Sequence, residues 1–241
     1  MHCFYIEPPA NGVAAMPKDE AKHAATVLRL RPGDPVCAMD GAGGRWDAVI
    51  DAVDDGVTVR LLDRLADNEA PVRVTVYEGV PKAEKLDVLA QKLTELGAAG
   101  LVPVKMERCV VRLDEKDGRK RRERLQRIAL EAAKQCRRGR ALEIDEPLTW
   151  KQAMRRMAHH DLVLVPWEDA SGRRMKDACI RHPDAKDIGI VIGSEGGMSG
   201  EEVKALTDMG ALTITLGPRI LRTETAAVVS AALAMQLWGD I

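Results

Sequence analysis

Two glycine-containing segments near the end of the chain constrain its fold most strongly. Residues 193–199 (GSEGGMS) follow one apolar run, residues 216–226 (LGPRILRTETA) follow another, and each segment leads into a helical pattern. Both segments are therefore predicted to be turns that connect a strand to a helix. Side by side at the carboxyl ends of a parallel sheet, two such turns would form one pocket, which is where open α/β sheets bind ligands. We expect the functional site to lie there.

The sequence from Val72 onwards alternates between strand and helix patterns. Short apolar runs predict the strands, and amphipathic spacing predicts the helices between them. The predicted strands begin at Val72 and span 101–104, 162–165, 188–192 and 212–216, and the main predicted helices cover 86–96, 125–136, 149–157, 199–210 and 226–237. Ser199 with Glu202 three residues later has the spacing of a capping box. This alternation predicts an α/β domain with a mostly parallel sheet over residues 71–241.

Residues 1–70 have a different pattern and are predicted to form a separate domain. A helix is expected at Pro17–Leu28, with proline suited to its first turn. Short apolar runs separated by turn residues follow at 36–39, 46–53 and 57–62. They predict a small antiparallel β unit, interpreted as a barrel. The polar stretch that ends at Pro71 is the predicted domain boundary.

The overall charge and the cysteines exclude several classes of protein. Lys and Arg number 36 against 37 Asp and Glu, so a formal net charge of -1 provides no global attraction to nucleic acid, and a polyanion site must be a local patch. The five cysteines form no C-x-x-C pair, which predicts reduced thiols and no metal site. No apolar run approaches the roughly 20 residues of a membrane span. We therefore expect a cytoplasmic protein with no membrane association.

The first turn lacks the signatures of a phosphate-binding loop. The sequence contains no Walker motif, and no G-x-G-x-x-G follows a strand. A tight connection without a binding role remains an alternative, since glycine allows positive φ. The carboxylate of Glu195 within the turn and the second unusual turn nearby favour a binding site. The missing motifs argue against the usual phosphate cradle and leave open a ligand held mainly through backbone amides and carbonyls, a kind of recognition that suits the edges of adenine and ribose.

The second turn concentrates charge at the expected mouth of the sheet. Arg219, Arg222 and Glu224 lie close to Gly217 in the sequence. Two cations are unfavourably placed at the positively charged N-terminal end of a helix. This placement favours an anionic or electron-rich partner over a merely solvated helix start. Thr223 is predicted to cap the helix rather than to act as a nucleophile.

A basic helical segment is predicted at residues 119–127 (RKRRERLQR), and more cations follow at 134–140. A solvated helix face is the alternative interpretation. We favour a site because nearly all of this charge has one sign in a chain of almost zero net charge, and such a patch attracts phosphates. With one Phe and two Tyr available for stacking, base selection is expected in the pocket.

The histidines indicate no catalytic group. His159 and His160 precede a predicted strand and His182 precedes Pro183, so surface positions are predicted for all three. No Ser-His-Asp or Cys-His arrangement can be recognised in the sequence.

The two turn segments together resemble the paired signature of the RsmE family, the 16S ribosomal RNA (uracil-N3)-methyltransferases of the SPOUT superfamily. Residues 192–199 and 216–226 carry the likeness. It extends over nearly the whole chain, because residues 28–34 are similar to the family's N-terminal PUA-like domain, and residues 92–97 with 107–109 are similar to its middle segment.

The chain departs from the family pattern at two places. Ser194 stands where the family usually has proline. Residues 134–138 are KQCRR, where the family more often has Glu-Gln-Ser-Gly-Arg, so only Gln135 and Arg138 match.

The resemblance implies a fold, a cofactor and an assembly. It implies a C-terminal SPOUT α/β domain with a deep trefoil knot, a PUA-like RNA-binding barrel at residues 1–70, S-adenosyl-L-methionine as the cofactor, and a homodimer. It implies cofactor binding by the loop after Leu164 and by the two turns, with the residues Leu164, Gly193, Glu195, Gly196, Gly197, Leu216, Gly217 and Leu221.

The resemblance also implies methylation of the N3 atom of a uridine in 16S rRNA of the small ribosomal subunit. Uridine N3 must lose a weakly acidic imide proton to attack the sulfonium methyl group, and a positioned base or cation lowers that barrier. We predict that Arg222 stabilises O4 or O2 of the base and that Glu224 accepts the proton or orients Arg222. The residues predicted to contact RNA are Arg29, Arg31, Lys85, Arg108, Arg121, Arg122, Arg138 and Arg219.

Two alternatives remain open at this point. One is methylation of the ribose 2′-O atom by an enzyme of the same superfamily. The other is a non-enzymatic protein that binds rRNA or the ribosome through its PUA-like domain and basic helix.

Overall fold

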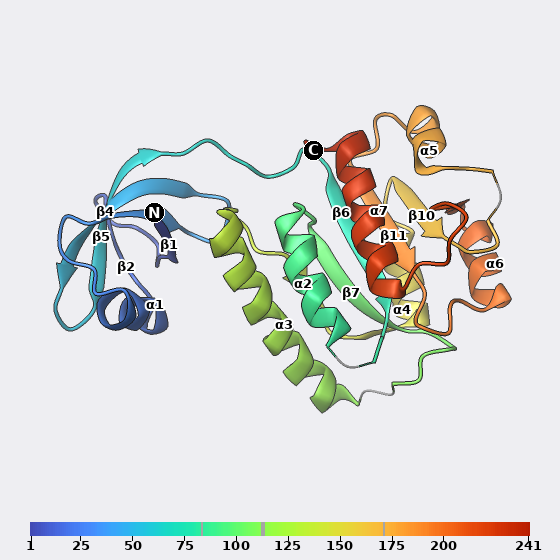
Figure 1. The fold of residues 1–241 in the computed structure, drawn as a ribbon, viewed down its shortest axis with the longest axis horizontal. Coiled ribbons are helices and arrows are strands. Elements are labelled where there is room, and N and C mark those ends of the chain that lie inside the picture. Colours follow the sequence, from blue (N-terminus) through green and yellow to red (C-terminus); the bar gives the residue numbers. More distant parts are fainter. Residues whose placement is uncertain (83, 112–113, 171) are drawn as a thin grey trace. The chain divides into compact units, whose positions relative to one another are not determined.

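The chain folds as two compact units. The structure, a computed structural model, describes residues 1–82, 84–111, 114–170 and 172–241 (Figure 1). The first unit comprises Met1–Glu69 and Ala133–Ala141, and the second comprises Ala70–Ala132 and Leu142–Ile241. The first unit thus includes a segment from the middle of the chain, which no pattern in the sequence had predicted.

A mixed β-sheet forms the first unit. Its strands are β1 (His2–Tyr5), β2 (Val13–Ala15), β3 (Pro35–Met39), β4 (Arg45–Val53) and β5 (Val57–Arg64), in the spatial order β1-β3-β4-β5-β2. The pairing of β1 with β3 is parallel and the other pairings are antiparallel. The antiparallel pairing predicted for the runs at 36–39, 46–53 and 57–62 is confirmed by β3, β4 and β5. The prediction did not include β1, and the long connection between β1 and β3 permits its parallel crossover. The predicted helix at Pro17–Leu28 begins as α1 (Lys18–Lys22) and continues as a π-helix, η1 (His23–Val27).

The segment Ala133–Ala141 is attached to the first unit by polar contacts. Arg138 Nη2 lies 2.6 Å from Glu69 Oε2, and Asn68 Nδ2 donates a hydrogen bond of 3.0 Å to the carbonyl of Arg137. Arg137 has a φ of 60°, a left-handed conformation that favours glycine. The backbone geometry therefore explains why the family more often has glycine at this position.

A parallel β-sheet lies at the centre of the second unit. Its strands are β6 (Arg73–Gly79), β7 (Gly100–Lys105), β8 (Glu143–Ile144), β9 (Leu148–Thr149), β10 (Leu162–Pro166), β11 (Asp187–Ile192) and β12 (Leu212–Ile214). Their spatial order is β12-β10-β11-β6-β7-β8, β9 also pairs with β7, and each of these pairings is parallel. The predicted α/β fold with a mostly parallel sheet is confirmed. Since β12, β10 and β11 are neighbours, their carboxyl ends lie side by side.

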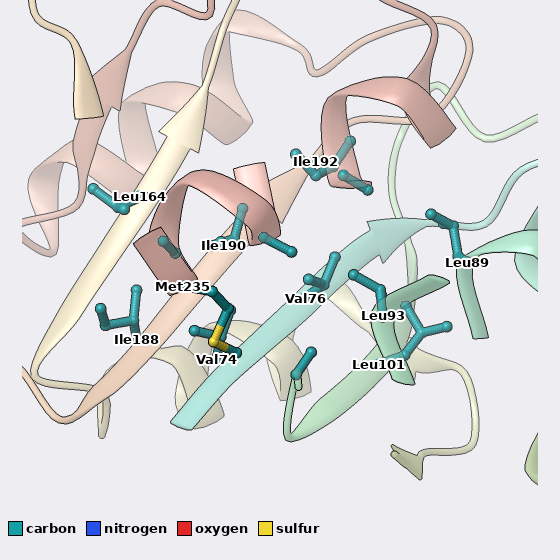
Figure 2. Close-up of a cluster of buried hydrophobic side chains, with 14 of the residues drawn as sticks. Val74, Val76, Leu89, Leu93, Leu101, Leu164, Ile188, Ile190, Ile192 and Met235 are labelled. Atoms are coloured by element: carbon teal, nitrogen blue, oxygen red, sulfur yellow. The ribbon is translucent and has the colours of Figure 1, made fainter. Parts of the chain in front are cut away.

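Helices pack on both faces of this sheet (Figure 1). They are α2 (Lys85–Glu95), α3 (Glu115–Cys136), α4 (Trp150–Met157), α5 (Met175–Arg181), α6 (Gly200–Asp208) and α7 (Thr223–Trp238). One hydrophobic core contains Val76 of β6, Leu89 of α2 and Met235 of α7 (Figure 2). The core on the other face contains Tyr77 of β6 and Met157 of α4. Neighbouring residues of β6 thus serve opposite cores, because successive side chains of a strand point to opposite faces.

The predicted capping box at the start of α6 is confirmed. The Ser199 hydroxyl accepts a hydrogen bond of 3.3 Å from the Glu202 N–H, and the Glu202 carboxylate accepts one of 2.9 Å from the Ser199 N–H. This reciprocal pair satisfies backbone donors that the first turn of a helix leaves without partners. By fixing where α6 begins, it also fixes where the first glycine turn ends.

Candidate active site

A cavity of about 410 Å³ lies at the carboxyl ends of β10, β11 and β12. Its lining comes from residues 166–168, 192–195, 197–198, 215–217 and 219–223, together with Lys85 and Ala226. Both glycine turns therefore face one cavity, as predicted from their positions after neighbouring strands. The volume falls in the range of about 300–1,000 Å³ that is usual for small-molecule sites.

The first glycine turn packs closely against itself. A Cβ atom added to Gly193 would lie 2.8 Å from the carbonyl carbon of Gly197 and 2.9 Å from the nitrogen of Met198. The Gly197 N–H donates a hydrogen bond of 2.8 Å to the carbonyl of Ser194. Glycine is required at position 193 because the backbone returns to within contact of it. The turn consequently has a fixed shape.

Ser194 connects this turn to the loop after β7. Its hydroxyl donates a hydrogen bond of 3.1 Å to the carbonyl of Arg108. In the other direction, Arg108 Nη1 donates a hydrogen bond of 3.2 Å to the carbonyl of Gly196. The serine that replaces the family's usual proline therefore adds a hydrogen bond between the first turn and the loop after β7, which a proline side chain cannot donate.

The second glycine turn is exposed. Arg219 and Arg222 are exposed, and Ile220 between them is 83% exposed. Gly217 has a φ of 111°, which requires glycine, and its added Cβ would meet no atom within 4 Å. The polar and apolar side chains of this turn are therefore available to a partner.

Thr223 begins α7 but does not cap it, so the predicted capping role is wrong. Arg222 occupies the N-cap position, and no side chain makes a cap hydrogen bond there. The Thr223 hydroxyl instead contacts Glu78 Oε1 and lies 2.8 Å from the carbonyl oxygen of Gly193. The start of α7 is thus attached to the end of β6 and to the first glycine turn.

Lys85 forms an ion pair with two carboxylates at the edge of the cavity. Its Nζ atom lies 3.1 Å from Glu195 Oε1 and 3.3 Å from Glu224 Oε2. Burial alone would lower the pKa of Lys85, but the hydrogen bonds and charges of the two glutamates outweigh burial and raise this pKa above its ordinary value. Burial alone would raise the pKa of Glu195, but this pKa is lowered overall. The Lys82 N–H, which donates a hydrogen bond of 2.9 Å to Glu195, and the charge of Lys85 both lower it. The cluster holds charged groups from α2, the first turn and α7 in one place.

The structure brings most of the predicted site residues together. Those that line the cavity are Lys85, Gly193, Glu195, Gly197, Leu216, Gly217, Arg219, Leu221 and Arg222. Gly196 lies beside Arg108 rather than in the lining, and Glu224 lies next to Lys85. Leu164 is 0% exposed and belongs to the hydrophobic core, so the lining from its strand comes from the residues that follow it.

The other residues predicted to contact RNA occupy different surroundings. Arg121 and Arg122 lie on α3 in the second unit, where Arg122 Nε donates a hydrogen bond of 3.0 Å to the carbonyl of Ile144. Arg29 and Arg31 are exposed residues of the first unit. Arg138 also belongs to the first unit, and it is 6% exposed and paired with Glu69. Its guanidinium group thus stabilises the fold of that unit.

Two sets of residues at or beneath the cavity were not singled out as site residues, although the loop after Leu164 was expected to hold the cofactor. Trp167 and Glu168 line the cavity from the loop after β10. Their position directly after a predicted strand was the available signal, because loops at the carboxyl ends of parallel strands form such sites. Glu78 underlies the cavity through Thr223, and its signal was a charged residue inside an apolar strand.

Neither a metal site nor a membrane-spanning helix is found among the residues that the structure describes. Among the described residues, no three His, Cys, Asp or Glu side chains gather closely enough to hold a metal ion. In the same part of the chain, no helix combines the length and apolar character needed to cross a bilayer.

Comparison with known proteins places the chain in a family. Residues 68–235 match the family described as an RNA methyltransferase domain, and residues 17–62 match an RNA methyltransferase PUA domain. The chain is 35% identical to ribosomal RNA small subunit methyltransferase E of Bacillus subtilis over 215 residues, which cover 86% of this chain and 84% of the relative. It is also 35% identical over 236 residues to the protein of that name from Mycobacterium bovis, covering 94% and 88% of the two chains.

A solved structure agrees with these matches over the whole length. Ribosomal RNA small subunit methyltransferase E from Neisseria gonorrhoeae, crystallised with S-adenosyl methionine, has a TM-score of 0.87 and 29% identity to this chain, and the match covers 100% of this chain and 99% of that one. The resemblance found in the two turn segments is therefore confirmed. The chain belongs to the ribosomal RNA small subunit methyltransferase E family.

Proposed function

We propose that this protein uses S-adenosyl-L-methionine to methylate the N3 atom of a uridine in 16S rRNA of the small ribosomal subunit. The family membership supports the rRNA substrate, and the paired turn signature supports the uridine N3 target. One observation carries the proposal most directly. The fixed first turn and the exposed arginines of the second turn line the same cavity, so a small cofactor and a nucleotide could meet there.

The residues of the cavity fit the proposed cofactor. Gly193, Gly197 and Gly217 bring main chain without side chains to the cavity lining, and the volume of about 410 Å³ suits a small molecule. We assign cofactor binding to Gly193, Glu195, Gly197, Leu216, Gly217 and Leu221, with the loop at 166–168. When bound, S-adenosylmethionine supplies an electrophilic methyl group on its sulfonium sulfur.

The reaction requires loss of the uridine N3 proton. Arg222 is exposed at the cavity, where its guanidinium group can stabilise the negative charge that develops on O4 or O2. Glu224 accepts the proton or orients Arg222. The ion pair with Lys85 holds the Glu224 carboxylate in place for either role. These assignments make Arg222 and Glu224 the catalytic residues of the proposal.

RNA binding is assigned to cations on both units. Arg108, Arg121, Arg122 and Arg219 belong to the second unit, and Arg29 and Arg31 belong to the first. Phosphate contacts of this kind position RNA without reading its sequence. We also propose a homodimer, a trefoil knot in the α/β domain, a division into domains near residue 70, and a cytoplasmic location, each of which rests on the family resemblance or on sequence composition.

The function is tested by analysing the modified nucleoside. Purified protein is incubated with S-adenosylmethionine and small ribosomal subunits from cells that lack the gene, and the digested RNA is examined by mass spectrometry. The expected product is 3-methyluridine, with the added mass on the base fragment. An added mass on the ribose fragment would show the 2′-O alternative instead.

The non-enzymatic alternative is tested separately. Isothermal titration of the protein with S-adenosylmethionine is expected to show binding at micromolar concentrations. If no binding occurs and no methylated nucleoside forms on either free rRNA or assembled subunits, the protein is an rRNA-binding protein without this activity.

A further inference from the structure

Glu78 is a carboxyl group buried inside the parallel sheet. It lies near the end of β6, opposite Ile192 of β11 on one side and Pro103 of β7 on the other. Its side chain is 0% exposed, and within the described part of the chain its Oε2 atom has no hydrogen-bond partner. Glutamate is rarely buried to this extent unless it is paired. The roles proposed for Arg222 and Glu224 leave this buried carboxyl group without a function.

The hydrogen bonds of Thr223 indicate which atoms carry protons. The Thr223 oxygen contacts Glu78 Oε1 and lies 2.8 Å from the carbonyl oxygen of Gly193. A threonine hydroxyl has a single proton to donate, and a backbone carbonyl can only accept. One of the two contacts therefore needs a second proton, which only the Glu78 carboxyl group can supply. With Glu78 donating to Thr223 and Thr223 donating to Gly193, both contacts are satisfied.

The charges around Glu78 agree with this arrangement. Burial raises the pKa of Glu78 well above its ordinary value; the contact with the Thr223 hydroxyl and the charge of Lys85 oppose this, and the charges of Glu224 and Glu195 raise the pKa further. Lys85 already pairs with Glu195 and Glu224. An ionised Glu78 would add a third negative charge to this cluster, with one oxygen buried and unpartnered, and the loss of hydration would not be offset by a partner.

We propose that Glu78 is a neutral hydrogen-bond donor that positions Thr223 and thereby joins the two glycine turns of the active site. Thr223 follows Arg222 and precedes Glu224, and Gly193 begins the first turn. The chain of hydrogen bonds from β6 through α7 to the first turn fixes the start of α7 against the cavity. Glu78 acts through Thr223 and is a positioning residue. This inference rests on the proposed function for the roles of Arg222 and Glu224.

The protonation of Glu78 can be measured without cofactor or RNA. Glutamate labelled with ¹³C at the side-chain carboxyl is incorporated into the protein, and the Glu78 resonance is identified by its loss in Glu78→Gln. We expect this resonance to show the chemical shift of a protonated carboxyl at pH 7. A carboxylate shift at pH 7 would overturn the proposal, whether or not the protein methylates uridine.

The pH dependence of stability gives a second readout on the same group. An acid whose pKa is raised by folding takes up a proton when the chain folds, so its contribution to stability falls as pH rises above about 4.3, the ordinary value for glutamate. Glu78→Gln removes this dependence. The difference in free energy of unfolding, variant minus wild type, should therefore increase from pH 4 to pH 8. A difference that decreases with pH would mean that Glu78 is ionised in the folded protein.

Kinetics separate positioning from a general structural role. Glu78→Gln keeps a neutral donor and is expected to retain at least half of kcat, whereas Glu78→Ala and Thr223→Val, which break the chain, should each lower kcat about tenfold with a smaller change in KM for S-adenosylmethionine. An equal loss in Glu78→Gln and Glu78→Ala would overturn the proposal, because the negative charge would then be what matters. If Glu78→Ala does not fold, the comparison of Glu78→Gln with Thr223→Val decides the question.

Discussion

In the first glycine turn, residues 193–199, the backbone packs against itself, whereas in the second, residues 216–222, residues 217–220 and Arg222 are exposed. Met198 in the first turn is 6% exposed and belongs to a hydrophobic core, while Ile220 in the second is 83% exposed. An added Cβ on Gly193 would meet backbone atoms at 2.8 Å and 2.9 Å, but one on Gly217 would meet nothing within 4 Å. We call residues 193–199 the closed turn and residues 216–222 the open turn.

The difference in packing and exposure indicates that the two turns have different roles in one cavity. The closed turn is held by its own backbone contacts, and binding to a fixed surface avoids the entropy cost of ordering it. That property suits a small cofactor that must be held in one geometry. The open turn presents Arg219 and Arg222 on an exposed loop, where they can adjust to an RNA strand that arrives from solvent. The following substitutions test whether the two turns differ in this way.

The largest difference is expected in stability when an apolar side chain of each turn is shortened. Met198→Ala should lower the free energy of unfolding by about 2–5 kcal/mol, because it leaves a cavity in the core. Ile220→Ala should change it by less than about 0.5 kcal/mol, because its side chain is solvated. Urea unfolding of both variants measures the difference. Similar losses in the two variants would show that the open turn is also packed.

The next effect concerns the reaction rather than the fold. Arg222→Ala should lower kcat about 10²–10³-fold, the usual cost of removing a group that stabilises developing negative charge. Because Arg222 is exposed, we expect an unchanged unfolding transition and unchanged binding of S-adenosylmethionine. Arg222→Lys is the matched control and should recover part of the rate, since it keeps the charge but loses the planar geometry. Normal turnover in Arg222→Ala together with normal turnover in Glu224→Gln would end the proposed assignment of catalytic roles.

A smaller loss is expected when the backbone of the closed turn is crowded. Gly193→Ala should destabilise the protein by about 1–3 kcal/mol, as overpacking does. It should also weaken binding of S-adenosylmethionine, measured by titration calorimetry, because the backbone of the turn must shift. Gly200→Ala, at the first position of α6, is the control, since its added Cβ meets nothing within 4 Å. If Gly193→Ala bound the cofactor normally, the closed turn would not be a fixed part of the site.

The sequence predicted the position of this site because strand, turn and helix patterns are local. The apolar runs before residues 193 and 216 and the capping pair Ser199 and Glu202 were enough to place both turns at one end of a parallel sheet. What the sequence could not predict were contacts between distant segments. His160 was predicted on the surface, but its side chain is 7% exposed, with Nε2 2.8 Å from the Tyr77 hydroxyl.

The same limit applies to the partners of polar side chains. Thr223 has the sequence position of a helix cap, yet its hydroxyl contacts Glu78, which is 145 positions earlier in the chain. Arg138 matched the family pattern as an RNA contact, yet it is paired with Glu69 in the first unit. A local pattern gives the type of an element and its ends, but the partner of a polar side chain depends on which strands become neighbours in the sheet.

The smallest effect is expected at Ser194, the one departure from the family pattern within the closed turn. Ser194→Ala removes the hydrogen bond from the hydroxyl to the carbonyl of Arg108. It should cost about 0.5–1.5 kcal/mol, the net value of one such bond. Arg108→Ala removes the second hydrogen bond, from Arg108 Nη1 to the carbonyl of Gly196, and leaves the bond from Ser194 intact. Because both hydrogen bonds join the same two segments, the double variant should bind S-adenosylmethionine more weakly than either single variant. Urea unfolding of the three variants measures their stability. Unchanged affinity in the double variant would mean that contacts within the closed turn, such as that between Gly193 and Gly197, are sufficient to hold its shape.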